Sequence, residues 1–245
     1  MSMMKAAVYN EYGSPADVLT KQDCPIPSPK EGEILVKTIL APMHNHDVLM
    51  VRGEYGDLLD PPAIGGTEGM GVVEALGEGV SGLSVGQRIV VAGVYNTWAE
   101  FFTAPASMAT PIPDAIGDEV AAQLIAMPSS SVVALNVLDA KPGEWIVLNG
   151  GNGAVGKSVA QIAKSRGVNV ASIVNRSKVI PDLERIGIGP VFAMDNPLWK
   201  DQARSVIKDG HVSAAIEMIG GAAAGDLVHL VGENGEVLSF GAMSN

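Results

Sequence analysis

One segment of the chain decides the fold: Trp145–Gly167, with the sequence WIVLNGGNGAVGKSVAQIAKSRG. The apolar run WIVL predicts a short strand, and the apolar residues after the glycines recur at helical spacing. Between them lies the pattern G-x-G-x-x-G, which opens a helix directly after a strand. The N-terminus of such a helix offers unpaired N–H groups and a partial positive charge to phosphates. The segment therefore predicts a dinucleotide site formed by Gly151, Asn152, Gly153, Ala154, Val155 and Gly156.

Strand and helix patterns continue to alternate on the C-terminal side of this segment. Such alternation predicts a doubly wound parallel sheet with helices on both faces. We expect this Rossmann-type domain to span residues 140–245. Its strands are predicted at Trp145–Leu148, Val168–Val174, Val191–Met194, Ser213–Met218 and Glu236–Phe240, and its helices at Ala154–Arg166, Pro181–Ile186, Leu198–Lys208 and Ala222–Val231.

Residues 1–115 instead show short apolar runs separated by glycine and proline turns, which predicts a small, mostly antiparallel β-barrel. Residues 116–139 change to helical spacing, and we expect Pro128 to kink this stretch or to divide it into two helices. The predicted fold class is therefore α/β, with a barrel domain, linking helices and the parallel-sheet domain. The barrel strands are predicted at Met4–Tyr9, Glu33–Leu40, Gly71–Leu76, Gln87–Val91 and Trp98–Thr103.

The composition limits which partners the chain can have. Of the 245 residues 47% are hydrophobic, and the formal net charge is −11. This acidity argues against nucleic acids and anionic membranes as partners, because both are bound through basic residues. The single cysteine, Cys24, excludes an intramolecular disulfide and a four-cysteine zinc site. No apolar run approaches the about 18 residues of a membrane span and no leader is visible, so we expect a cytoplasmic protein.

The end of the second predicted strand indicates which dinucleotide binds. An NAD site places an acidic residue there to hold the ribose 2′-hydroxyl. This chain has Asn175, Arg176 and Ser177 instead. Arg176 can pair with a 2′-phosphate, while Ser172, Asn175 and Ser177 can add hydrogen bonds, so NADPH is the expected cofactor. The alternative is that Arg176 is a solvated loop residue.

In this order of domains, several motifs together resemble the medium-chain dehydrogenase/reductase superfamily, over residues 5 to about 243. The strongest is PAIGGTEGMGVVEALG at residues 62–77, followed by VGQRIV at residues 85–90. The resemblance implies a GroES-like barrel beside a Rossmann domain, and a substrate cleft with His44, Asn45, Thr67 and Trp98. For Trp98 two interpretations stay open, since the ring either lines this cleft or fills the barrel.

The residues at the zinc positions of this superfamily argue against a metal. Zinc-dependent members carry a Cys three residues before a conserved Asp, and a His before the Glu of a G-H-E motif. Here His44 precedes Asp47, and Thr67 precedes Glu68. Thr is a poor zinc ligand, and the cysteines of a structural zinc site are absent. We therefore expect no metal, and the alternative is a site that uses His44, His46, Asp47 and Glu68.

Two zinc-free branches of the superfamily remain, the 2-enoyl thioester reductases and the quinone oxidoreductases. Residues 52–56 (RGEYG), 149–152 (NGGN), 217–221 (EMIGG) and 239–243 (SFGAM) look more like the enoyl reductases. This resemblance implies that NADPH reduces an activated carbon–carbon double bond, with a quinone as the alternative substrate. It implies that Tyr55 is either the proton donor or a contact of the nicotinamide. It also implies that Ser130, Gly241 and Met243 contact the cofactor.

The superfamily pattern continues beyond Asn245, so we expect either a truncated chain or a natural short form, in which Glu236–Phe240 can be an exposed sheet edge. In a complete form we expect a homodimer. The expected reaction partner is a small molecule or an acyl thioester of CoA or acyl-carrier protein. The short length keeps a third alternative open, a dinucleotide-binding fragment without turnover.

Overall fold

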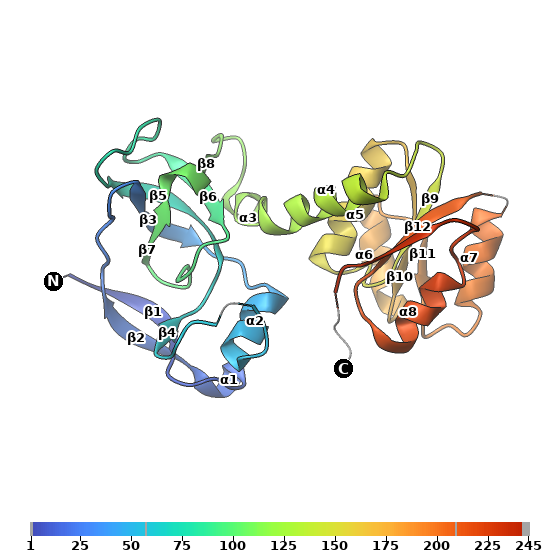
Figure 1. Cartoon of the computed structure of the whole chain (residues 1–245), viewed down its shortest axis with the longest axis horizontal. Coiled ribbons are helices and arrows are strands. Elements are labelled where there is room, and N and C mark those ends of the chain that lie inside the picture. The colour runs from blue at the N-terminus through green and yellow to red at the C-terminus, as the bar shows by residue number, and fades with distance from the viewer. Residues whose placement is uncertain (1, 57, 209, 242–245) are drawn as a thin grey trace. The chain divides into compact units, whose positions relative to one another are not determined.

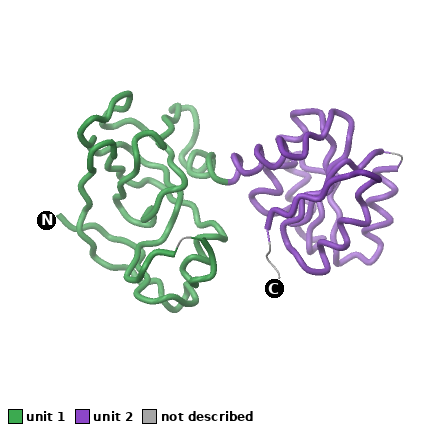
Figure 2. The backbone as a smooth tube through the Cα atoms, in the orientation of Figure 1, with its two compact units in different colours: residues 1–126 green, residues 127–245 purple. Residues whose placement is uncertain are grey.

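The computed structural model describes residues 2–56, 58–208 and 210–241. The chain divides between Ala126 and Met127 into two units, each with its own core (Figures 1 and 2). This boundary falls inside segment 116–139, which the sequence marks as linking helices.

A five-stranded parallel sheet forms the centre of unit 2, residues 127–245 (Figure 1). The strand order is β11-β10-β9-β12-β13, so the chain starts in the middle of the sheet and reverses direction after β11. Sheets of this topology bind ligands at the carboxyl ends of the strands, where the order reverses; here that point lies between β9 and β12. The strands are β9 (Trp145–Leu148), β10 (Asn169–Val174), β11 (Val191–Ala193), β12 (Val212–Glu217) and β13 (Glu236–Ser239), and the helices are α4 (Ala126–Leu138), α5 (Ala154–Ser165), α6 (Ile180–Arg185), α7 (Trp199–Ile207) and α8 (Gly221–Val228), with the 3₁₀ turn η2 at Ser177–Val179.

Helices cover both faces of this sheet. Successive residues of a strand point to opposite faces and therefore enter different cores. Ile146 and Leu148 of β9 belong to a core with α4, α5 and α6, whereas Val147 belongs to a core with α7 and α8. A strand that is buried on both sides needs an uninterrupted apolar run, and WIVL provides one. The topology and the two cores confirm the predicted doubly wound parallel sheet.

Two antiparallel sheets form unit 1, residues 1–126 (Figure 2). Five strands have the order β7-β3-β5-β6-β8, and three have the order β2-β1-β4. Backbone hydrogen bonds between Ala7 N and Trp98 O and between Glu100 N and Lys5 O join the two sheets. The elements are β1 (Met3–Tyr9), α1 (Pro15–Val18), β2 (Leu19–Pro25), β3 (Glu33–Leu40), α2 (Asn45–Arg52), β4 (Ala63–Ile64), β5 (Glu68–Leu76), β6 (Arg88–Ala92), β7 (Phe101–Pro105), the 3₁₀ turn η1 (Ala106–Met108), β8 (Thr110–Pro111) and α3 (Asp118–Ala121).

Unit 1 also contains elements that the sequence did not predict. Helix α2 lies within residues 1–115, which were assigned to β-structure alone. It has only 8 residues, too few for a helical period to stand out from strand alternation. Strand β2 was missed because most of its residues are exposed or half-exposed, so it carries no apolar signal. It is recognisable only by its pairing with β1.

Pro128 does not interrupt a helix as expected. The break between α3 and α4 lies earlier, at residues 122–125, and Pro128 is the third residue of α4. The first turn of a helix tolerates proline because its N–H groups have no partners within the helix. None of the helices in the described residues is long and apolar enough to cross a membrane.

Candidate functional site

The glycine-rich loop of unit 2 joins the end of β9 to the start of α5. Gly156 packs so tightly that a Cβ atom there would lie 2.6 Å from Gly150 O and 2.9 Å from Gly151 Cα. A Cβ on Gly151 would lie 3.0 Å from Ser172 Cβ, and one on Gly153 would lie 3.1 Å from Gly150 O. The three glycines therefore let the helix, the loop and β10 approach one another, which is the use that this spacing predicts.

The N-terminus of α5 is the part of this loop that can bind an anion. Gly153 is its N-cap residue and has no side chain to occupy the first N–H groups of the helix. Gly153 N donates to Gly150 O (2.8 Å), which closes the turn. Ala154 is exposed in the first turn, whereas Val155 is half-buried against the core. The backbone is thus open to a phosphate on the solvent side.

A pocket of about 330 Å³ adjoins this loop. Asn175, Arg176 and Lys178 contribute polar groups from the segment after β10. The prediction from sequence included Asn175 and Arg176 but missed Lys178. The signal was present, because Lys178 is a second basic residue two positions after Arg176. Two cations and no carboxylate in the lining fit a phosphate on the ribose. The remaining lining residues are Gly150, Asn152, Val179 and Ile219.

Ser177 and Ser172 have other surroundings than those expected of phosphate ligands. The amide and the hydroxyl of Ser177 donate to the carboxylate of Asp195, at 3.0–3.2 Å. Ser172 is fully buried under the loop, and its hydroxyl has no hydrogen-bond partner among the described residues. The sequence placed both serines beside the 2′-phosphate. In the structure Ser177 anchors the loop to Asp195, and Ser172 lies beneath Gly151.

A buried polar pair connects β9 and β12 where the strand order reverses. Asn149 Nδ2 donates to Glu217 Oε1 (2.8 Å), and Met218 N donates to Asn149 Oδ1 (2.7 Å). The same Oε1 accepts from Ile219 N (2.8 Å) and Gly220 N (2.6 Å). Burial raises the pKa of Glu217, but these three hydrogen bonds together hold it below its ordinary value. Glu217 is therefore an ionised carboxylate at neutral pH, and the sequence reasoning missed its role.

The other expected cofactor contacts are placed less specifically. Ser130 is half-buried on α4, next to the fully buried Ser131, whose hydroxyl donates to Met127 O (2.9 Å) and has Val155 O at 3.3 Å. Gly241 follows β13, and a Cβ there would lie 3.0 Å from Met218 O. Met243 lies outside the described residues. These contacts remain predictions.

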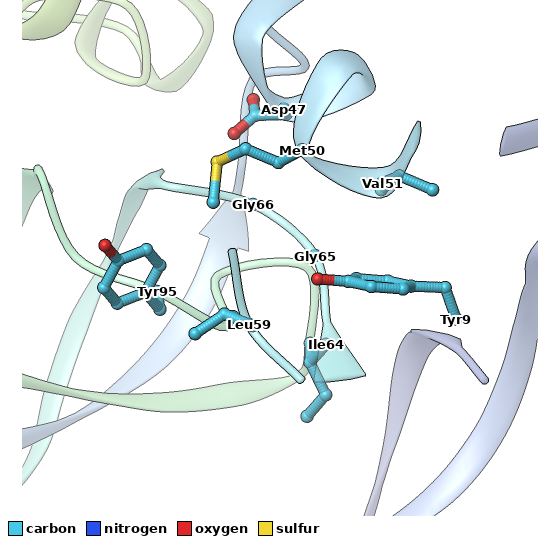
Figure 3. A pocket seen from close by; sticks show the side chains of 9 residues that line it. All are labelled: Tyr9, Asp47, Met50, Val51, Leu59, Ile64, Gly65, Gly66 and Tyr95. Carbon is cyan, nitrogen blue, oxygen red and sulfur yellow. The ribbon is translucent and has the colours of Figure 1, made fainter. Parts of the chain in front are cut away.

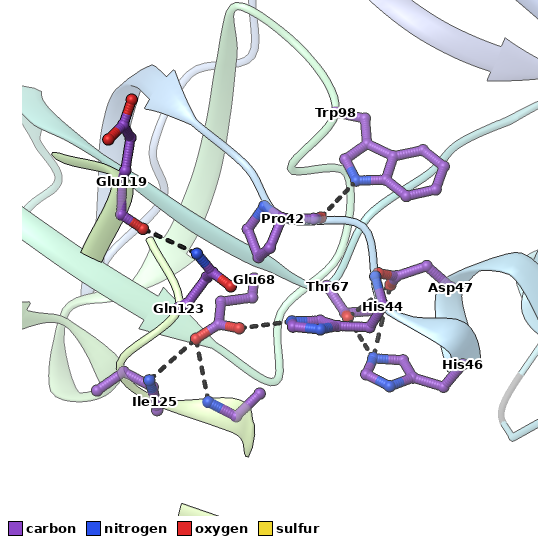
Figure 4. A network of polar contacts seen from close by, with 11 residues as sticks. Pro42, His44, His46, Asp47, Thr67, Glu68, Trp98, Glu119, Gln123 and Ile125 are labelled. Carbon is purple, nitrogen blue, oxygen red and sulfur yellow. Dashed lines mark hydrogen bonds and ion pairs between the residues drawn. The ribbon is translucent and has the colours of Figure 1, made fainter. Parts of the chain in front are cut away.

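Unit 1 holds a buried network around Glu68, the first residue of β5 (Figure 4). His44 Nε2 donates to Glu68 Oε2 (2.6 Å), and both side chains are buried. The other oxygen, Glu68 Oε1, accepts from Ile125 N (3.1 Å) and Ala126 N (3.0 Å). The hydrogen bond to Glu68 raises the pKa of His44, against the opposing effect of burial. Glu68 thus connects His44, the N-cap residue of α2, to the backbone amides of Ile125 and Ala126 at the end of unit 1.

A second chain of hydrogen bonds lies beside the first. Thr67 Oγ1 donates to Asp47 Oδ1 (2.7 Å), since a carboxylate can only accept. Thr67 has one hydroxyl proton, so the contact of 2.7 Å with His46 Nε2 must be a bond that His46 donates. Burial lowers the pKa of His46 below its ordinary value, which makes the ring neutral at pH 7. Neutral His46 is therefore protonated on Nε2 and keeps a lone pair on Nδ1.

Tyr55 is attached to this network through His46. Its ring stacks on the His46 ring with the centroids 6.0 Å apart, and His46 in turn stacks on His44 at 5.1 Å. Tyr55 is 53% exposed, so its hydroxyl group belongs to a side chain that solvent reaches. Asn45 is exposed at the start of α2. His44, Thr67 and Tyr55 lie in one region together with His46, Asp47 and Glu68. Their roles in binding a substrate stay predictions.

Trp98 packs against the backbone of the motif that precedes Thr67. Cβ atoms on Gly65 and Gly66 would lie 2.3 Å and 2.4 Å from atoms of the Trp98 ring, so both positions require glycine. The indole donates to Pro42 O (3.1 Å) and adjoins the core around Tyr9 and Val51. Close to it, Tyr9, Asp47 and Tyr95 line a cavity of about 10 Å³ (Figure 3). That space holds about one water molecule and no substrate.

The donor atoms of this region are engaged with one another. His44 Nε2 binds Glu68, and Asp47 accepts from the His44 amide (2.8 Å) as well as from Thr67. Across the described residues, no group of three or more His, Cys, Asp or Glu side chains is arranged to hold a metal ion. The network is built from hydrogen bonds between protein groups.

Three comparisons relate this geometry to known proteins. The model of the alcohol dehydrogenase GroES-like domain family matches residues 30–136. The mitochondrial enoyl-[acyl-carrier-protein] reductase of Xenopus tropicalis is 29% identical over 247 residues, which cover 98% of this chain and 70% of the relative.

Two mycobacterial structures are also similar. Rv1454c, solved with NADPH, is 30% identical with a TM-score of 0.88, and a quinone oxidoreductase is 30% identical with a TM-score of 0.83. Each match covers 99% of this chain and 75% of the other. Together with the sheet topology, these likenesses confirm the predicted fold class of a GroES-like domain and a doubly wound parallel sheet.

Proposed function

Because the chain belongs to the medium-chain dehydrogenase/reductase superfamily, we propose that it is an NADPH-dependent, zinc-free reductase of activated carbon–carbon double bonds, with a 2-enoyl thioester as substrate. That it is an oxidoreductase of this superfamily follows from the relatives. Cofactor, metal and substrate are the proposal. We assign the cofactor to unit 2 and the substrate-side residues to unit 1, with segment 116–139 as the linker.

The pocket beside the glycine-rich loop carries the proposal of NADPH. Arg176 and Lys178 supply two positive charges to a pocket of about 330 Å³ next to the start of α5. No acidic residue lines this pocket among the described residues, and a carboxylate would repel a 2′-phosphate. The NADPH complex of mycobacterial Rv1454c supports the same cofactor.

The loop geometry supports where the diphosphate binds. Gly153, the N-cap residue of α5, is exposed and has no side chain over the first N–H groups of the helix, whereas Gly151 is buried. The N–H groups at the start of α5 then face the phosphates and hold them by hydrogen bonds and by the helix dipole. Bound here, NADPH supplies the hydride for the β-carbon of the alkene.

The protein has to supply a proton for the α-carbon, and it has to stabilise the enolate formed before that proton arrives. Tyr55 is our candidate, since its solvent-exposed phenol O–H can donate a proton or a hydrogen bond to the enolate. Its ring rests on neutral His46, which Thr67 and Asp47 hold in one orientation. His46 and Thr67 thus act as positioning residues for Tyr55.

The absence of zinc is part of the proposal. Thr67 takes the place where zinc-dependent members carry a histidine, and it donates to Asp47. His44 Nε2 is already bound to Glu68 Oε2. A zinc ion needs three or four nitrogen, sulfur or oxygen donors that converge on one point.

The enoyl thioester is favoured over the quinone by the resemblance of RGEYG, NGGN, EMIGG and SFGAM to enoyl reductases, and by the Xenopus tropicalis relative. The mycobacterial quinone oxidoreductase keeps the quinone as a second candidate. The two substrates differ in one testable respect, since reduction of the thioester consumes a carbon–carbon double bond.

Turnover by the purified chain distinguishes these possibilities. NADPH oxidation is followed at 340 nm with crotonyl-CoA, with a benzoquinone, and, in reverse, with NADP⁺ and a simple alcohol, each with and without a zinc chelator. We expect turnover of crotonyl-CoA that the chelator does not change. Faster quinone turnover would select the second candidate, and chelator-sensitive alcohol oxidation would overturn the proposal. NADPH binding without any turnover would identify a dinucleotide-binding fragment.

A further inference from the structure

The turn between β12 and α8 is the part of the dinucleotide site that no glycine motif explains. Ile219 of this turn lines the pocket together with Gly150 and Asn152 of the β9–α5 loop. The two segments come from strands that are neighbours in the sheet but 68 residues apart along the chain, as the distance from Asn149 to Glu217 shows. Side-chain contacts are therefore needed to hold the β12–α8 turn against the β9–α5 loop.

The Glu217 carboxylate holds the β12–α8 turn to the end of β9 through one oxygen atom. Glu217 Oε1 accepts from Asn149 Nδ2, from Ile219 N and from Gly220 N, at 2.6–2.8 Å. Glu217 is 3% exposed and Asn149 is 1% exposed, so water does not compete for these bonds. Hydrogen bonds to a buried ionised group are stronger than neutral ones, and a donor left unpaired there is costly.

The pair has a second connection that fixes its orientation. Asn149 Oδ1 accepts from Met218 N, so both ends of the Asn149 side chain are held by the β12–α8 turn. Gly220 adopts φ +87°, a left-handed conformation that turns the chain into α8 and directs its amide at the carboxylate. Hydrogen bonds of Asn149 and Glu217 thus connect the end of β9 to the β12–α8 turn beside the pocket.

We propose that Glu217, together with Asn149, is a positioning residue of the dinucleotide site: it holds the wall formed by Ile219 against the glycine-rich loop. This inference rests on the proposed function, since it takes the pocket to be the NADPH site. A carboxylate beside a site for an anionic ligand is unfavourable unless its charge is compensated. Because three donors surround its acceptor oxygen, the negative charge of Glu217 is turned toward the protein.

The test compares Glu217→Ala, Glu217→Gln and Asn149→Ala with the parent by fluorescence titration with NADPH and by amide hydrogen exchange. Glutamine keeps one oxygen in place of Oε1, so we expect a small loss of affinity for Glu217→Gln. For Glu217→Ala and Asn149→Ala we expect Kd to rise about tenfold or more. The amides of Ile219 and Gly220 should exchange faster, while those of β9 and β10 keep their protection. In turnover, KM for NADPH should rise while kcat changes little.

Glu236→Gln is the matched control, because it removes a carboxylate from the exposed first residue of β13 and should leave Kd unchanged. If Glu217→Ala does not fold, Asn149→Ala and Glu217→Gln carry the test. Parent-like NADPH affinity in a folded Asn149→Ala would overturn the inference. If the parent itself binds no NADPH, the proposed function fails; if the parent binds and all variants bind equally, only the positioning role fails.

Discussion

Arg176 and Lys178 share the work of recognising a 2′-phosphate, because both line the same pocket. A charge-assisted contact contributes about 1.5–3 kcal/mol. We expect Arg176→Ala to weaken NADPH binding by roughly 10- to 150-fold and to leave NADH binding nearly unchanged. Lys178→Ala should act in the same direction, and the double variant should lose most of the preference for NADPH.

Fluorescence titration with both cofactors measures this preference. Arg185→Ala is the control, since Arg185 lies on α6 outside the pocket and pairs with Asp182. If Arg176→Ala weakens the binding of NADPH and NADH equally, Arg176 supports the loop and does not bind the phosphate.

Tyr55 can be tested by removing its hydroxyl group alone. If Tyr55 delivers the proton, Tyr55→Phe should lower kcat by about 10²- to 10⁴-fold with little change in KM, because the bond strengthens mainly in the transition state. Tyr95→Phe, another exposed tyrosine of unit 1, should be unaffected. A normal rate for Tyr55→Phe would reject the catalytic role, and a loss of cofactor affinity in Tyr55→Ala would then point to packing on the nicotinamide.

At the scale of elements, the hydrogen bonds that connect α2 through Glu68 to the backbone of Ile125 and Ala126 should make unit 1 sensitive to pH. The folded pKa of His44 is raised, chiefly by Glu68. Its protonation therefore stabilises the fold fully below the ordinary pKa of about 6.5, and this contribution is lost as pH rises through the folded pKa. We expect the difference in unfolding free energy between the parent and His44→Gln to be larger at pH 6 than at pH 8.

Urea unfolding at the two pH values measures that difference. His211→Gln, at an exposed position of unit 2, serves as the comparison and should show a smaller change. A difference that grows toward pH 8 would mean that His44 is neutral throughout.

The contact between α5 and the glycine-rich loop leaves no room for a methyl group. In Gly156→Ala the new Cβ would lie 2.6 Å from Gly150 O, and backbone atoms would have to shift. Overpacking of this kind costs about 1–3 kcal/mol, so we expect lower stability and weaker NADPH binding. Thermal unfolding and NADPH titration check both.

Gly225→Ala is the matched control for this change. Gly225 lies in α8, and a Cβ there meets no atom within 4 Å. Alanine should stabilise that helix by up to about 1 kcal/mol. Equal behaviour of the two variants would contradict the close packing at Gly156.

At the scale of the whole molecule, the two units should respond differently to the cofactor. All residues that line the pocket beside the glycine-rich loop belong to unit 2. A ligand at 100 times its Kd stabilises the state that binds it by about 2.7 kcal/mol. We expect NADPH to slow hydrogen exchange in β9, β10 and β12, and to leave β3, β5 and β6 of unit 1 unchanged. Equal protection in both units would show that they unfold as one.

Unit 2 could be predicted from the sequence almost element by element, because its signals are local. Trp145–Leu148 has the predicted bounds, and helix α5 ends one residue before the predicted Arg166. Strands β9, β10 and β12 are buried on both faces and each long helix on one, so apolar runs and helical periods appear directly in the sequence. Unit 1 was predicted less completely, since a strand such as β2 is defined by its pairing and not by its composition.

The sequence by itself thus determined the strand–glycine–helix segment, the class of fold and the presence of Arg176 in place of an acid, because these depend on residues that are close along the chain. Only the tertiary structure decided which polar groups meet. His44 and Glu68 are 24 residues apart, Glu68 and Ala126 are 58 apart, and Asn149 and Glu217 are 68 apart. A hydrogen bond requires atoms within about 3 Å, and for such distant residues that proximity exists only after the strands and helices have packed.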